Sequence, residues 1–231
     1  MARSILRGKN VLVTAGSTRA PIDAVRFISN RSSGRLATEI AYELLRRGAT
    51  VTFLHGIGSE TPQEHATPIQ KRHLNTVAVE SFDELHHSVP TLMNATRFDC
   101  VIHAMAVLDY LPTEKIPGKI KSGRRELILK LAPAPKILPL FRMYAPNAFL
   151  VGFKLEVDVS TEELCQRAHK LIEQAGADMV VANLMPSEKP DLHTAYLVHP
   201  NVAHSVNVPE EIVGKKQIAW TVVEEVTKAI T

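Results

Sequence analysis

The chain has 231 residues, of which 45% are hydrophobic and 22% charged, enough to bury a sizeable core, and we interpret it as one domain. A net charge of only +3 argues against a dedicated nucleic-acid binder, and no apolar run approaches the roughly 20 residues that cross a bilayer. Two cysteines, Cys100 and Cys165, are too few for a disulfide framework. We therefore expect a cytoplasmic protein with neither a nucleic-acid nor a membrane partner.

The first half of the chain alternates between strand and helix patterns. Residues 10–16 form a β-branched run, residues 33–48 have helical spacing, and residues 50–55 return to a strand pattern. A capping box at residues 81–84 opens a second helix, and the apolar residues 98–107 indicate a central strand.

The second half continues this alternation and ends with a hairpin and a helix. The expected elements are an edge strand at 126–131, a helix at 135–144, a strand at 150–153, a helix at 160–174, a strand at 178–182, a hairpin formed by 195–198 and 202–206, and a helix at 209–230. The pattern predicts an α/β fold, with a doubly wound, Rossmann-like, mostly parallel sheet and an antiparallel hairpin at one edge. In such sheets the ligand site lies beyond the carboxyl ends of the strands.

The positive charge is concentrated in one segment. Residues 113–136 contain seven basic and two acidic residues, a surplus of five, so the rest of the chain sums to −2. We interpret residues 111–126 as a flexible basic flap that contacts an anionic ligand, with a solvated charged loop as the alternative. Asp109, at the end of the central strand, is placed to order a metal or a ribose.

Two earlier segments offer hydrogen-bond donors to an anion. The loop at residues 16–21 precedes residues 22–28, which we interpret as the start of a helix that favours phosphate; the alternative is a plain turn. Asn30, Ser32 and Ser33 crowd the start of the next helix, where donors stabilise a phosphate or a charged acyl oxygen. Ordinary capping by one of the two serines is the alternative.

Several other site types are disfavoured. The first loop lacks a Gly-x-Gly-x-x-Gly fingerprint and no acidic residue follows the second strand, which argues against a nicotinamide dinucleotide site. No serine lies in a nucleophile elbow, and the ten histidines do not show metal-ligand spacing, so we assign no protein-bound metal. Phe153 ends a strand at a point where a ring can lie against a base.

Six segments together resemble the phosphopantothenate–cysteine ligases, in their stand-alone bacterial form. They occur in the family's order: 22–34 (IDAVRFISNRSSG), 106–110 (AVLDY), 119–121 (KIK), 135–138 (PKIL), 151–156 (VGFKLE) and 177–183 (ADMVVAN). The resemblance implies an enzyme of coenzyme A synthesis that activates the carboxylate of 4′-phosphopantothenate with CTP or ATP and Mg²⁺. The amine of cysteine then displaces the nucleotide from the acyl intermediate.

The resemblance also assigns roles to individual residues. Asn30 would steady the acyl nucleotide, and Arg26, Ser32, Ser33 and Gly34 would bind the substrate. The nucleotide would contact Gly16, Thr18, Asp109, Lys119 on a mobile flap, Pro135, Lys136, Ile137, Leu138, Phe153 and Lys170.

The chain departs from the family pattern in places that bear on function. Gln174 occupies a position where the family can have a second lysine, which leaves the choice of nucleotide open. It also keeps open a non-catalytic nucleotide sensor or scaffold protein; a reductase dependent on NAD(P) ranks lower. The family resemblance further implies a homodimer, with the hairpin at residues 195–206 as the expected interface.

Overall fold

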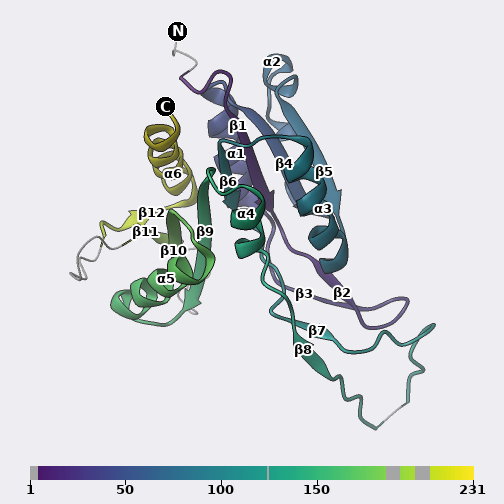
Figure 1. Ribbon diagram of the computed structural model, residues 1–231. Coiled ribbons are helices and arrows are strands. Elements are labelled where there is room, and N and C mark those ends of the chain that lie inside the picture. Colours follow the sequence, from purple (N-terminus) through teal and green to yellow (C-terminus); the bar gives the residue numbers. More distant parts are fainter. Residues whose placement is uncertain (1–4, 124, 186–192, 201–208) are drawn as a thin grey trace.

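The protein is built around one eight-stranded sheet (Figure 1), seen in a computed structural model that describes residues 5–123, 125–185, 193–200 and 209–231. In spatial order its strands are β12 (Ile212–Val213), β11 (Thr194–Val198), β10 (Met179–Met185), β9 (Phe149–Val157), β6 (Cys100–His103), β1 (Asn10–Ala15), β4 (Thr50–Gly56) and β5 (Leu74–Val79). The strands from β10 to β5 are parallel, whereas β11 is antiparallel to both of its neighbours. The predicted fold class is confirmed.

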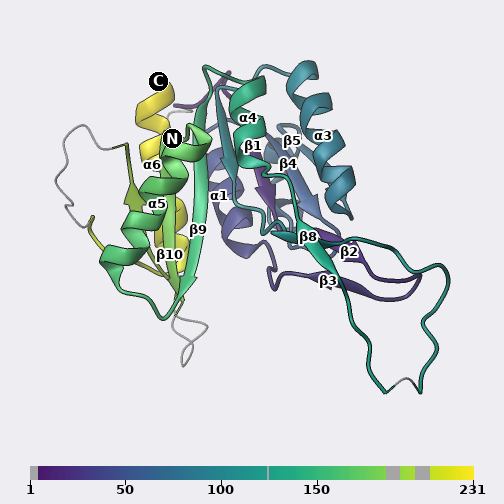
Figure 2. The ribbon, with the colours of Figure 1, turned by 60° about the horizontal axis from the view of Figure 1, so that its bottom comes forward.

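Helices cover both faces of this sheet (Figures 1 and 2). One face carries α1 (Arg35–Arg46) and α6 (Lys215–Ile230); the other carries α3 (Phe82–Ala95), α4 (Leu138–Tyr144) and α5 (Thr161–Ala175). Alternate residues of β1 supply both layers, because Val11 and Val13 pack under α1 and α6 whereas Leu12 packs under the other three helices. In the described part of the chain, no helix is long and apolar enough to span a membrane.

Two short connections complete the first half of the fold. A 3₁₀ turn, η1 (Pro62–Glu64), and the one-turn helix α2 (Pro68–Lys71) join β4 to β5. Strand β5, the lateral edge strand of the sheet, was not predicted from the sequence. The N-cap predicted at Ser81 is present, and Ser160 caps α5 in the same way: these serines accept the backbone N–H groups of Glu84 and Glu163 at 3.1 and 3.2 Å.

Two small antiparallel hairpins extend from the carboxyl edge of the sheet (Figure 2). The first pairs β2 (Arg19–Pro21) with β3 (Phe27–Ser29), so the helix expected at residues 22–28 is wrong. The carboxylate of Asp23 accepts the N–H groups of Val25 and Arg26, both at 2.7 Å. These side-chain to backbone hydrogen bonds stabilise a tight turn instead of a helix.

The second hairpin pairs β7 (Tyr110–Pro112) with β8 (Leu131–Pro133). The edge strand expected at residues 126–131 is therefore wrong in its bounds, since only Leu131 belongs to both ranges. Strand β7 is three residues long and ends in a proline, so its ladder reaches only three partners on β8.

Two helices and the late hairpin also differ from expectation. Helix α4 begins at Leu138 instead of residue 135, and α6 begins at Lys215 instead of residue 209, because β12 and Gly214, with a φ of 89°, precede it. The first arm of the predicted hairpin is β11, and its second arm, residues 202–206, lies outside the described residues. In the described part of the chain β11 pairs with β10 from Thr194 to Val198 but with β12 only at Thr194 and Ala195, and the dimer interface expected at residues 195–206 stays a prediction.

Candidate functional site

The candidate site lies at the carboxyl ends of β1 and β6, where the order of the sheet reverses. From β1 the chain moves outward to β4 and β5, whereas after β6 it moves the other way to β9 and β10. Ligands of open α/β sheets bind at such a reversal, because the loops that follow the two strands diverge there.

Three glycines let the loops at this edge touch. Gly16 and Gly34 have positive φ angles of 74° and 77°, which L side chains rarely adopt. A Cβ on Gly34 would lie 3.1 Å from the backbone nitrogen of Gly16, and one on Gly56 would lie 2.0 Å from the carbonyl oxygen of Ser17. Glycine is therefore required where β1, β4 and the start of α1 meet.

The loop after β1 is tied to the loop after β6. The N–H of Ala106 donates to the carbonyl of Gly16 at 2.8 Å, and Ser17 and Ala106 form a parallel bridge beyond the named strands. Thr18 is fully buried, and its hydroxyl has no hydrogen-bond partner in the described part of the chain. A buried hydroxyl in this state is costly, and an oxygen of a ligand or of water would satisfy it.

Asn30 bridges the same two loops. Its side-chain amide donates to the carbonyl oxygens of Ala106 at 3.2 Å and Val107 at 3.1 Å. The side chain is exposed and follows β3 directly. In this structure its N–H groups thus hold the loop after β6, and its predicted role toward an acyl nucleotide stays a prediction.

The start of α1 is open toward these loops. The N-cap is Gly34, and no side chain caps the helix. The Ser33 hydroxyl lies at a long 3.4 Å from the N–H of Arg35, so the interpretation of Ser32 or Ser33 as an ordinary cap is not supported. First-turn N–H groups beside the Gly16 loop are the arrangement that favours a bound anion.

Asp109 and Lys136 meet at the base of the second hairpin. Their charged atoms are 2.5 Å apart, and both side chains are about 70% exposed. Ile137 and Leu138 are buried, so their side chains belong to the core beneath this pair, and a Cβ on Gly152 would touch Leu138 at 2.8 Å. The structure therefore brings Asp109 together with the segment that begins at Pro135.

Two predicted nucleotide contacts lie farther along the sheet. Phe153, on β9, is half-buried against the layer of α1 and α6. Lys170 is exposed and lies ten positions beyond the N-cap of α5, about 15 Å along the helix from the carboxyl edge at 1.5 Å per residue. The structure does not bring Lys170 to the loops around Asn30, and both roles stay predictions.

His103 is a buried residue of the site that was not predicted from the sequence. It ends β6, its Nδ1 lies 2.8 Å from the hydroxyl of Thr14, and its ring lies 5.2 Å from that of Phe141. The N–H of Met105 also donates to Thr14, at 3.2 Å. Burial lowers the pKa of His103 to about 4, so a neutral imidazole supports the loop that Asn30 holds.

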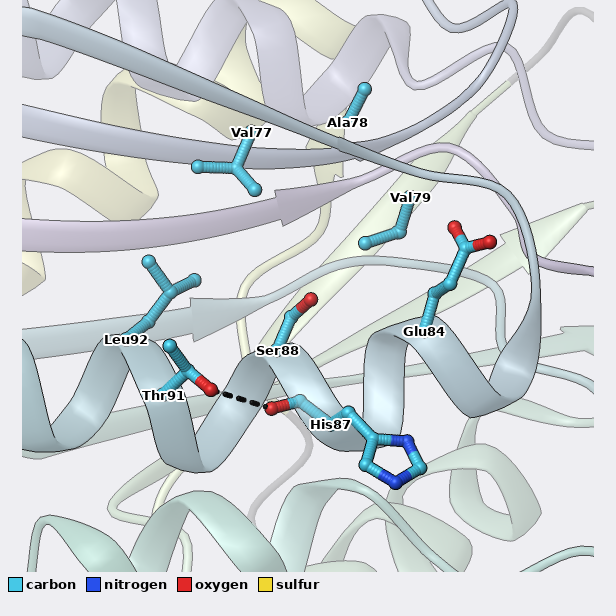
Figure 3. Close-up of a pocket in the computed structure, with 8 residues that line it drawn as sticks. All are labelled: Val77, Ala78, Val79, Glu84, His87, Ser88, Thr91 and Leu92. Atoms are coloured by element: carbon cyan, nitrogen blue, oxygen red, sulfur yellow. Dashed lines mark hydrogen bonds between the residues drawn. The ribbon is translucent and has the colours of Figure 1, made fainter.

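Two cavities lie away from these residues. One, of about 350 Å³, is an open groove between β5 and α3, with Val77 and Val79 on one wall and Ser88 and Leu92 on the other (Figure 3). The second, of about 660 Å³, lies at the amino edge of the sheet around Arg142. Neither contains a predicted site residue. Within the described ranges, no three His, Cys, Asp or Glu side chains converge as metal ligands do.

Residues 6–230 match the family model described as the C-terminal domain of the DNA/pantothenate metabolism flavoproteins. The chain belongs to this family. It is 36% identical over 225 residues to the coenzyme A biosynthesis bifunctional protein CoaBC of Thermococcus kodakarensis, and 30% identical over 230 residues to that of Methanocaldococcus jannaschii. These matches cover 97% and 96% of this chain but 52% and 51% of the relatives, so the chain spans about half their length.

Solved structures agree with the family. The DNA/pantothenate metabolism flavoprotein of Streptococcus pneumoniae superposes with a TM-score of 0.81 at 25% identity, over 96% of this chain and 99% of that one. The C-terminal domain of a CoaBC protein gives 0.70 at 26% identity, with 97% of each chain covered. A Cab2 mutant in complex with phosphopantothenate-cysteine shares the fold, with a TM-score of 0.72 at 20% identity over 98% of this chain and 89% of that one.

Proposed function

We propose that the chain is a ligase of coenzyme A biosynthesis that joins 4′-phosphopantothenate to cysteine through an acyl-nucleotide intermediate. The observation that carries the proposal is the meeting of Gly16, Thr18, Asn30 and Asp109 at one edge of a sheet whose family and relatives are named for pantothenate and coenzyme A metabolism. Single-residue roles are part of the proposal.

The proposed reaction has two steps. A carboxylate oxygen of 4′-phosphopantothenate attacks the α-phosphorus of the nucleotide, and pyrophosphate leaves. The amine of cysteine then attacks the acyl carbon, loses a proton and expels the nucleoside monophosphate, which forms the amide. Both steps develop negative charge on oxygen, and fixed donors at a helix start stabilise such charge.

Such donors lie at the carboxyl edge of the sheet, next to Asn30. The first-turn N–H groups of α1 and the loop from Gly16 to Thr18 face the phosphates in the proposal. Asn30 would turn one N–H from the carbonyl of Val107, now 3.1 Å away, to the acyl oxygen. The exchange replaces one hydrogen bond with another, and the remaining bond to Ala106 keeps the side chain in place.

The nucleotide is a co-substrate in this proposal, either CTP or ATP, and Mg²⁺ arrives with its phosphates. The charged pair of Asp109 and Lys136 is exposed at the same edge, where a carboxylate fits a ribose or a metal and an ammonium fits a phosphate. Lys119 and Lys121 belong to the basic segment that follows β7.

We also propose a cytoplasmic homodimer. Four large apolar side chains, at least 44% exposed, lie on or beside the two small hairpins, namely Val25, Phe27, Tyr110 and Leu131. Pairing these hairpins between two copies would remove apolar area from water. Light scattering coupled to gel filtration should give twice the chain mass of 25.5 kDa, and a monomer at micromolar concentration would contradict the proposal.

The direct test supplies 4′-phosphopantothenate and Mg²⁺ with either CTP or ATP, with and without cysteine. Mass spectrometry should detect the amide product only when cysteine is present, and one nucleotide should support the faster reaction. Nucleotide binding without any product would favour the non-catalytic alternative, for which Gln174 is the motivating departure.

A further inference from the structure

The turn of the first hairpin is bonded to the segment that contains Lys119. The N–H of Ile116 donates to the carbonyl of Ile22 at 2.9 Å, and the N–H of Ala24 donates to the carbonyl of Gly118 at 3.0 Å. These bonds join residues about 95 positions apart. They attach the start of the basic segment, at Ile116 and Gly118, to the first hairpin, ahead of the basic residues from Lys119 onward.

A buried carboxylate completes this connection. Asp23 is 3% exposed, and its Oδ2 accepts the N–H of Ile120 at 3.0 Å. The same oxygen accepts the guanidinium of Arg26 at 3.0 Å, while Oδ1 accepts the N–H groups of Val25 and Arg26 at 2.7 Å. Enclosing a charge requires such partners, and Asp23 has them from its own turn and from the flap.

Protonation of Asp23 is suppressed by the same contacts. The N–H of Ile120 first, and those of Val25 and Arg26 after it, lower the pKa of Asp23 to about 2, against the opposing effect of burial. The carboxylate therefore stays charged throughout the neutral range. The bond to Ile120 is charge-assisted, and bonds of this kind are stronger than those between neutral groups.

These contacts fix the backbone on both sides of Lys119. Gly118 is held through its carbonyl and Ile120 through its N–H, and Ile120 also buries its side chain, which is 5% exposed. The lysine side chain itself is exposed. Residues 121–123 and 125–130, which follow, form neither helix nor strand. The backbone around Lys119 is thus anchored at the root of the basic segment, and the mobility expected of residues 111–126 stays a prediction.

We propose that Asp23 is a positioning residue that fixes the backbone of Lys119 so that its ammonium group is presented to the phosphates of the nucleotide. This inference rests on the proposed ligase function. An anchored lysine loses less conformational freedom when the nucleotide binds than one on a free loop, so Asp23 acts on nucleotide affinity without touching the nucleotide.

The variant Asp23→Asn separates this role from simple folding. An Asn keeps the size and one acceptor oxygen, but it loses the charge and turns an NH₂ group toward either Ile120 or the N–H groups of its own turn. The control is Asp178→Asn, because Asp178 likewise binds a backbone N–H from a distant segment, that of Leu150 at 2.7 Å, and an arginine, Arg142 at 2.5 Å, although it is more exposed than Asp23. Asp178 precedes β10 and lies at the opposite edge of the sheet.

Nucleotide affinity is measured by titration calorimetry with CTP and with ATP, each with Mg²⁺, for the intact chain and its variants. We expect the Kd of the preferred nucleotide to rise about tenfold in Asp23→Asn and in Lys119→Ala, and to stay unchanged in Asp178→Asn, consistent with the loss of one charged contact. The double variant should bind no more weakly than the weaker single variant, because Asp23 acts through Lys119. If the Kd of the double variant rose by the product of the two single increases, the two residues would act independently and the inference would be overturned.

Hydrogen exchange of residues 116–120 gives a readout that does not depend on catalysis. Exchange should be faster in Asp23→Asn than in the wild type or in Asp178→Asn; unchanged exchange would show that Asp23 does not anchor this segment. If the wild type binds nucleotide and Asp23→Asn binds it equally well, this inference alone fails. If the wild type binds no nucleotide, the proposed function fails first and the positioning role with it.

Discussion

At the scale of single residues, Asn30 links two loops that are 76 positions apart in the chain. Its amide faces two carbonyl oxygens, of Ala106 and Val107. An aspartate in the same place would set a negative oxygen against these acceptors, so the contact would become repulsive. The proposed donor to the acyl oxygen would disappear as well.

We expect Asn30→Asp to lower the rate of product formation at least about 100-fold, the typical cost of removing one donor to a developing oxyanion. The fold should persist because the side chain is exposed, and circular dichroism with thermal unfolding checks this. Asn75→Asp, an exposed position on β5 far from the site, serves as the control. Unchanged turnover in Asn30→Asp would remove Asn30 from the chemistry.

His103 makes stability depend on pH. Its imidazole is neutral in the fold, with a pKa of about 4, whereas in the unfolded chain it takes up a proton below its ordinary value of 6.5. The unfolded state therefore binds more protons between these values, and the free energy of unfolding falls as the pH falls from 6.5 toward 4. The loss is at most about 3 kcal/mol, at 1.36 kcal/mol per pH unit.

The prediction is that His103→Gln loses less stability than the wild type when urea unfolding is compared at pH 7 and pH 4.5. Carboxylates titrate in both proteins, so the difference between them isolates His103. Equal pH dependence would contradict the burial of a neutral imidazole at this position.

Site residues that follow the end of a strand could be predicted from the sequence, whereas residues that position other site residues could not. Asn30 and Asp109 lie where a loop follows a strand, and a parallel sheet places such loops at one edge. The roles of Asp23 and His103 depend on partners more than 85 positions away, Ile120 and Thr14, and a local pattern carries no signal for such pairs.

At the scale of elements, glycines set how closely β1, β4 and α1 approach. Gly56 ends β4, and a Cβ there would meet the carbonyl of Ser17 at 2.0 Å. Backbone cannot yield as a flexible side chain does, so the loop from Ser17 to Thr18 would have to shift away from β4.

Gly56→Ala should lower the free energy of unfolding by about 1–3 kcal/mol, the usual range for overpacking, and should weaken nucleotide binding. Gly8→Ala is the control, because its φ of 84° is unfavourable for alanine but its Cβ would meet nothing within 4 Å. Denaturant unfolding and calorimetry should show that the control loses stability yet keeps its nucleotide affinity. Wild-type affinity in Gly56→Ala would contradict the close packing of the loop as a requirement of the site.

The long periodic helices were predicted from the sequence, and the three-residue strands were not. The helices α1, α3 and α5 follow clear apolar spacing, and two of them open with serine caps. The strands β2, β3, β7 and β8 are three residues each, and three of these contain proline. These strands depend on their pairing, locally for Arg19 with Ser29 and over a longer separation for Tyr110 with Pro133, and not on the propensity of three residues.

In the whole molecule, the site is built at one edge of a single sheet, where the carboxyl ends of its parallel strands lie. The strands on either side of the reversal between β1 and β6 carry loops that Asn30 and the bridge from Ser17 to Ala106 hold together. The hairpins extend from this same edge and carry the anchored root of the basic segment (Figure 2). The alternation of strand and helix in the sequence is enough to predict the class of the sheet, but neither its edge strand β5 nor the hairpins that extend from its carboxyl edge.

An experiment without cysteine tests the proposed acyl-nucleotide intermediate. Wild-type protein is mixed with 4′-phosphopantothenate, Mg²⁺ and CTP or ATP, quenched within seconds, and examined by mass spectrometry for the acyl nucleotide while pyrophosphate is counted. The proposal predicts about one pyrophosphate per site, an acyl nucleotide of matching amount, and its conversion to the amide once cysteine is added. Bound nucleotide with neither acyl nucleotide nor pyrophosphate would contradict the ligase and favour a protein that only binds nucleotide.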